Sequence, residues 1–133
     1  MSPSTLFSPV SPSGPRPGED TWLWLIKIVT GPLLLLVLVL HFTANHYLGS
    51  MPSGLMTYDD VIRYFQNPVI PAIEILFLVT VVTHSLIGLR SIILDMNPSG
   101  STLKIVTWFL VIFGVSSVGY GVWLALKIAS LGI

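Results

Sequence analysis

Three long apolar stretches, separated by polar segments, organise the chain. The first covers residues 21–44 and contains an unbroken aliphatic run from Leu33 to Leu40, and the others cover residues 68–95 and 103–128. A helix rises about 1.5 Å per residue, so roughly 20 residues cross the ~30 Å hydrocarbon layer of a bilayer. The pattern therefore predicts an all-α integral membrane protein with three transmembrane helices.

Polar breakers delimit these spans. The loop at residues 45–67 is long enough to hold a short helix, and the breaker cluster at residues 97–100 separates the second span from the third. Pro32 lies inside the first span, where it is expected to kink the helix or loosen its backbone bonding near Ile28.

The two ends of the chain differ in composition. Residues 1–20 are rich in Pro and Ser and carry few apolar side chains, so we expect a disordered N-terminal tail. Residues 21–133 then form a single three-helix transmembrane domain. In the third span, Ser117 and Gly121 have the small-xxx-small spacing of closely packed membrane helices.

Composition narrows the range of functions. Only 9% of the residues are charged, whereas soluble domains carry about 25%. This excludes a soluble enzyme acting alone. The absence of cysteine excludes disulfides, Cys-ligated zinc and iron–sulfur clusters, and the zero net charge argues against a nucleic-acid partner. Chemistry here requires a cofactor, a partner subunit or both.

The basic residues indicate an orientation. An N-terminus in the cytoplasm places four of the six Lys and Arg residues on or near the cytoplasmic side, and this is the arrangement that the positive-inside rule favours. The four are Arg16, Lys27, Arg90 and Lys104, and the other two are Arg63 and Lys127. We expect a multi-pass protein of the cell (plasma or inner) membrane.

One face of the second span carries the candidate chemistry. At about 100° per residue, His84, Gly88, Ser91 and Asp95 share a direction, which we call the His84 face. A haem needs a His nitrogen for its iron and a nearby surface without bulk, and this face offers both. The residues alone leave open that His84 only hydrogen-bonds to a neighbouring helix, that Asp95 is a helix-end carboxylate, and that Arg90 is an interfacial anchor.

Three further polar residues lie near the ends of the first two spans that face away from the cytoplasm, and these are His41, His46 and Glu74. His41 is eleven residues after Thr30 and shares its direction. His41 and His84 lie at depths too different to serve one iron, so ligation by both would imply two haems. His46 is expected to be solvated, and Glu74 is either a hydrated carboxylate or part of a proton path.

These residues resemble a known family. The segment from His84 to Asp95 is similar to the H-x-x-x-G-x-R-x-x-x-x-D signature of succinate dehydrogenase membrane anchors, the small cytochrome b subunits. The Thr30-Gly31 pair followed by His41 also resembles the first helix of that family. The resemblance extends over about residues 21–127.

The resemblance implies a function. Such anchors pair as two three-helix subunits, giving a six-helix bundle that tethers an iron–sulfur subunit and a flavoprotein subunit and passes electrons from succinate to a quinone. It implies that His84 is an axial ligand of haem b, with the second His from the partner anchor. Ser91 and Arg90 would lie near the cofactor, with Arg90 at the haem propionates or the quinone, and Asp95 would border the quinone site. His41 matches members that hold a second, distal haem.

One position departs from the family pattern. Many members carry a Tyr directly after the Asp, and this chain has Met96 there, so another group must hydrogen-bond the quinone carbonyl. Two alternatives stay open on the sequence: a fumarate reductase anchor, and a structural or assembly membrane protein whose His and Asp are packing groups.

Overall fold

The computed structural model describes residues 14, 19–48 and 56–132. Within them the chain is entirely helical: α1 (Thr21–Leu48), α2 (Tyr58–Phe65), α3 (Val69–Asp95) and α4 (Gly100–Ala129). Three of these helices, α1, α3 and α4, are long and apolar enough to cross a membrane. The predicted all-α fold with three spans is confirmed. Most of the predicted disordered tail lies outside the described residues.

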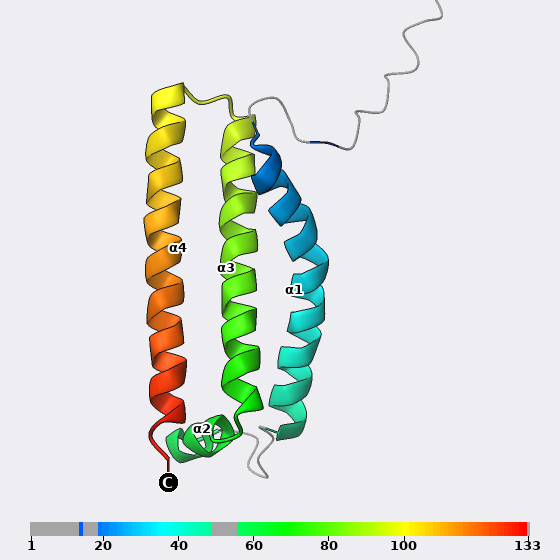
Figure 1. Cartoon of the computed structure of the whole chain (residues 1–133), viewed down its shortest axis with the longest axis vertical. Helices are drawn as coiled ribbons and strands as arrows, with labels where there is room; N and C mark the ends of the chain where they lie inside the picture. Colours follow the sequence, from blue (N-terminus) through cyan, green and yellow to red (C-terminus); the bar gives the residue numbers. More distant parts are fainter. Residues whose placement is uncertain (1–13, 15–18, 49–55, 133) are drawn as a thin grey trace, which may run out of the picture.

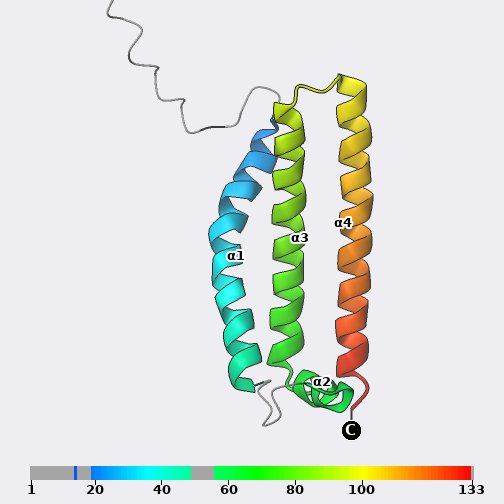
Figure 2. The same cartoon turned by 180° about the vertical axis from the view of Figure 1, so that it is seen from behind.

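The helix α3 is the centre of the arrangement. It packs against α1 on one side and α4 on the other. Figures 1 and 2 show these three helices side by side in one layer, with α2 lying across the ends of α3 and α4. We call the end with the α3–α4 turn the hairpin end and the opposite end the α2 end. The start of α1 lies at the hairpin end, so the His84 face can meet α1 there.

Local caps set where the helices begin. At the start of α1, Asp20 Oδ1 accepts the backbone N–H of Trp22 at 2.8 Å. At the start of α4, the Ser99 side chain accepts the backbone N–H of Thr102 at 3.2 Å, so this helix begins three residues before the predicted residue 103. Pro32 stays within one continuous helix, which is bowed in Figure 1.

The expected short helix in the loop is present as α2. A capping box starts it: Thr57 Oγ1 accepts the backbone N–H of Asp60, and Asp60 accepts the backbone N–H and the hydroxyl of Thr57. These hydrogen bonds from Thr57 hold the pKa of the Asp60 carboxyl below its usual range. Helix α2 buries Ile62 and Tyr64, and Tyr64 belongs to a small core with Ala44 and Ile70.

Small residues bring α4 close to α3. A Cβ added to Gly114 would lie 2.6 Å from Leu86 Cδ1, and one added to Gly121 would overlap Leu78 Cδ2. The two leucine side chains therefore fill the notches that the glycines leave in α4. Gly121 had been singled out from its spacing, and the structure gives it this packing role.

Candidate functional site

A hydrogen bond between the first two long helices fixes the His84 ring. His84 Nδ1 lies 3.0 Å from Thr30 Oγ1, and the Thr30 hydroxyl donates its one proton to the carbonyl of Ile26 at 2.7 Å. Because the Ile26 carbonyl is the nearest acceptor, we assign the hydroxyl proton to that bond; the Thr30 oxygen then accepts from His84, and the imidazole proton is on Nδ1. The lone pair of a neutral His84 then lies on Nε2. This is the nitrogen that a metal could take, held in orientation by the bond at Nδ1.

Two glycines leave the surroundings of this ring uncrowded. A Cβ added to Gly31 would lie 3.6 Å from His84 Cε1, in ordinary van der Waals contact, so the glycine leaves space for about one methyl group beside the imidazole. A Cβ added to Gly88, one turn after His84, would have no described atom within 4 Å. A ring with small neighbours is what a flat cofactor requires. Gly88 was expected beside His84 from the sequence, whereas Gly31 was named only in the resemblance to the family's first helix.

A charged cluster continues the His84 face toward the hairpin end. Lys27 Nζ donates to Ser91 Oγ at 3.0 Å, Ser91 Oγ donates to Glu19 Oε1 at 2.9 Å, and Lys27 forms a salt bridge with Glu19. Asp95 ends α3 at this same end and is exposed. The structure thus brings His84 and Ser91 together against α1, as their shared direction predicts.

Glu19 is a residue that the sequence interpretation missed. It was assigned to the disordered tail, yet its side chain is only 2% exposed and lies on Lys27 and Ser91. Two signals could have found it. Glu19 and Asp20 directly precede the apolar run, as acidic residues do at helix starts, and Glu19 is eight residues from Lys27, close to two helical turns.

Arg90 lies on another face of α3. It is about 120° around the helix from His84, and its Nε donates to Thr107 Oγ1 of α4 at 3.1 Å. The structure therefore directs this guanidinium toward α4 and not toward α1. Its predicted place at haem propionates or a quinone stays a prediction.

The second predicted ligand lies at a different depth. His41 is eleven residues from Thr30, about 16 Å along α1 toward the α2 end. Its Nδ1 is 2.9 Å from Glu74 Oε2, and its ring stacks on Phe77 with the centroids 4.5 Å apart. Asn45 Nδ2 donates to the His41 carbonyl at 2.8 Å and to Glu74 Oε1 at 3.3 Å. Glu74 thus has a protein partner.

The remaining polar groups at the α2 end are peripheral to this pair. His46 is exposed, in agreement with its expected solvation, and its ring meets that of Tyr47 edge-on. Burial raises the pKa of the Tyr64 phenol, with a smaller contribution from the Glu74 carboxylate. The Tyr64 hydroxyl is buried with no hydrogen-bond partner among the described residues.

The potential metal ligands among these side chains suit a cofactor that itself supplies most of the ligands to its metal. Within residues 19–48 and 56–132, no three His, Asp or Glu side chains gather as they would around a bare metal ion. A porphyrin supplies four nitrogens and asks the protein only for axial ligands. One oriented imidazole beside two glycines fits that requirement from one side.

Comparison with known proteins identifies a family. The profile of the family described as "Succinate dehydrogenase/Fumarate reductase transmembrane subunit" matches residues 3–119. The chain is also 32% identical, over 74 residues, to a protein of Archaeoglobus fulgidus described as "Succinate dehydrogenase hydrophobic membrane anchor subunit". That match covers 56% of this chain and 61% of the relative. No solved structure matches. The chain is thus a multi-pass membrane protein that belongs to the succinate dehydrogenase/fumarate reductase transmembrane subunit family.

Proposed function

We propose that this chain is the membrane-anchor subunit of a succinate dehydrogenase and that it binds haem b through His84. The observation that carries the haem proposal is the hydrogen-bond arrangement at Thr30, which leaves the lone pair of His84 on Nε2. Family membership and the name of the Archaeoglobus relative support the wider assignment. Haem b, when bound, would supply a one-electron redox centre within the bundle.

The partners follow from the same proposal. A second anchor subunit would complete a six-helix bundle and supply the other axial His, and an iron–sulfur subunit and a flavoprotein subunit would dock at the hairpin end. That end would face the cytoplasm of a cell with the complex in its plasma or inner membrane. Three of the five Lys and Arg residues that the structure describes lie at this end, namely Lys27, Arg90 and Lys104, and the positive-inside rule favours such an end in the cytoplasm.

The residues around His84 would have distinct tasks. Thr30, on α1, would hold the Nδ1–H tautomer and so leave Nε2 available to the iron. Ser91, bonded to Lys27 and Glu19, closes the face on the hairpin side. A quinone that accepts two electrons must also take two protons, and Asp95 could hold a proton at its carboxylate near the aqueous edge. His41 remains the candidate ligand of a second, distal haem.

The haem assignment is tested by removing the ligand. In the purified complex, His84→Ala should abolish or grossly perturb one b-type haem signal in the reduced-minus-oxidised absorption spectrum. A pyridine haemochrome assay on the same sample gives the number of haems per anchor pair. His46→Ala is the matched control, because His46 lies on α1 and is exposed.

The outcomes separate the alternatives. An unchanged spectrum in the His84 variant would refute the ligand assignment. A complex that contains no haem at all would favour a structural or assembly protein. A loss of haem in the His46 variant as well would point to general misfolding.

A further inference from the structure

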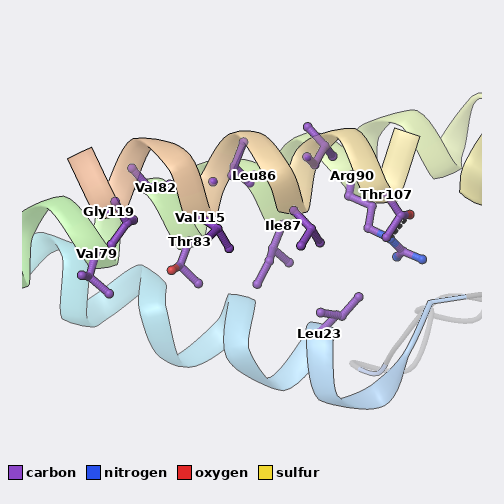
Figure 3. Close-up of a pocket in the computed structure, with 14 residues that line it drawn as sticks. Leu23, Val79, Val82, Thr83, Leu86, Ile87, Arg90, Thr107, Val115 and Gly119 are labelled. Carbon is purple, nitrogen blue, oxygen red and sulfur yellow. Dashed lines mark hydrogen bonds between the residues drawn. The ribbon is translucent and has the colours of Figure 1, made fainter. Parts of the chain in front are cut away.

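A long apolar groove runs between α3 and α4, away from the His84 face. It has a volume of about 570 Å³. Figure 3 shows Thr83 and Ile87 of α3 on it, Val115 and Gly119 of α4 opposite, and Leu23 of α1 near the hairpin end. None of the residues of the His84 face lines it.

Positively charged side chains lie at the hairpin end of the groove. Arg90 lines its hairpin end, bonded to Thr107, and both residues also line a second hollow with Lys104 and Trp108. The two hollows therefore adjoin. Lys104 and Trp108 are exposed, as a headgroup-binding cation and an interfacial aromatic should be. Asp95 is about 140° around α3 from Arg90, so its carboxylate is on a different side of the helix.

The length of the groove distinguishes between occupants. From Arg90 to Val79 it follows eleven residues of α3, about 16 Å. That is close to half of the ~30 Å hydrocarbon layer, the depth of one leaflet. A partner helix would need a groove across both leaflets, whereas one acyl chain needs this depth and places its headgroup at the charged end.

We propose that this groove binds one anionic phospholipid, with an acyl chain between α3 and α4 and its phosphate at Arg90 and Lys104. Basic pockets between membrane helices at the cytoplasmic side are suited to anionic headgroups. The bare backbone at Gly119 makes room for the chain, because a Cβ there would have no described atom within 4 Å.

The test compares two lipids with the same acyl chains, one with an anionic headgroup and one with a zwitterionic headgroup. The purified complex is incubated with equal amounts of phosphatidylglycerol and phosphatidylcholine of the same acyl chains, and bound lipid is counted by native mass spectrometry. The wild-type complex should prefer phosphatidylglycerol. Lys104→Gln should weaken that binding about fivefold, as expected for one cation near the phosphate, and added salt should reduce the difference.

Matched variants distinguish lipid bound in the groove from lipid bound elsewhere on the surface. Gly119→Phe fills the groove and should remove the bound lipid, whereas Ile112→Phe adds the same ring at an exposed α4 position that does not line the groove. Lys127→Gln removes the α4 cation at the opposite end and should leave binding unchanged. The haem spectrum should be the same in all four variants.

Three results would overturn the proposal. The first is the absence of any preference for phosphatidylglycerol in the wild type, and the second is an equal loss of binding in the Lys104 and Lys127 variants. The third is a Gly119→Phe complex that loses its partner subunits while the Ile112→Phe complex keeps them. That result would show that the groove is a packing surface for another subunit.

Discussion

At the scale of single residues, the hydroxyl proton of Thr30 sets the tautomer of His84. Thr30 donates this proton to the Ile26 carbonyl, so its oxygen accepts a hydrogen bond from the imidazole. Both residues could be singled out from the sequence, because each shares a helix direction with other candidates. It could not show that they touch, since contact between residues 54 positions apart depends on how α1 packs on α3.

Replacing this acceptor should change the haem without removing its ligand. In Thr30→Val the side-chain shape is nearly kept, but His84 Nδ1–H loses its acceptor and the imidazole becomes a weaker donor to iron. We expect haem to be retained, with a raised midpoint potential in a spectroelectrochemical titration. Thr30→Ser, which keeps the hydroxyl, should restore the wild-type potential. An identical potential in the Val and wild-type proteins would mean that this hydrogen bond is absent from the assembled complex.

At the scale of helices, the apolar pattern was sufficient for the spans but not for their ends. The first span continues to Leu48, four residues beyond the predicted residue 44, because His46 and its neighbours stay helical at the membrane edge. The third starts at Gly100 because Ser99, grouped with the breakers, acts as a cap. Glu19 was missed for a related reason. Because it follows a Pro-rich segment, it was assigned to the disordered tail and not to the start of the first helix.

The α3–α4 contact makes a second prediction, at two neighbouring glycines. In Gly121→Ala the new methyl must displace Leu78, so overpacking should destabilise the bundle by about 1 kcal/mol or more. Gly119→Ala meets open space and should stabilise it by about 0.5–1 kcal/mol, because alanine loses less backbone entropy in a helix. Denaturant unfolding of the detergent-solubilised complex, followed by circular dichroism, measures both. Equal shifts of the same sign would show that Leu78 does not fill the notch.

At the scale of the whole molecule, a single layer of three helices leaves large apolar surfaces uncovered. Trp108, Phe109 and Trp123 of α4 are all more than half exposed. In a membrane, lipid or another subunit covers such side chains. The identity of the partners cannot be read from one chain, because under the proposed function the groups that would complete the site lie on other polypeptides. The expectation of partner subunits comes from family membership.

The proposed electron path from succinate to quinone yields a prediction for Asp95. In Asp95→Asn the side chain can no longer pass a proton, so quinone reduction should slow by about 10²-fold or more, the range typical of general acid–base groups. Succinate oxidation with an artificial dye acceptor should stay at the wild-type rate, because the dye takes electrons before the anchor. Parallel loss of both activities would indicate a defect in assembly and not in proton transfer.

The bond between Thr30 and His84 also bears on how far the imidazole depends on the rest of the chain. It joins only α1 and α3, so no residue of α4 takes part in it. Changes in α4 that leave the first two long helices packed together should therefore leave the orientation of this ring intact.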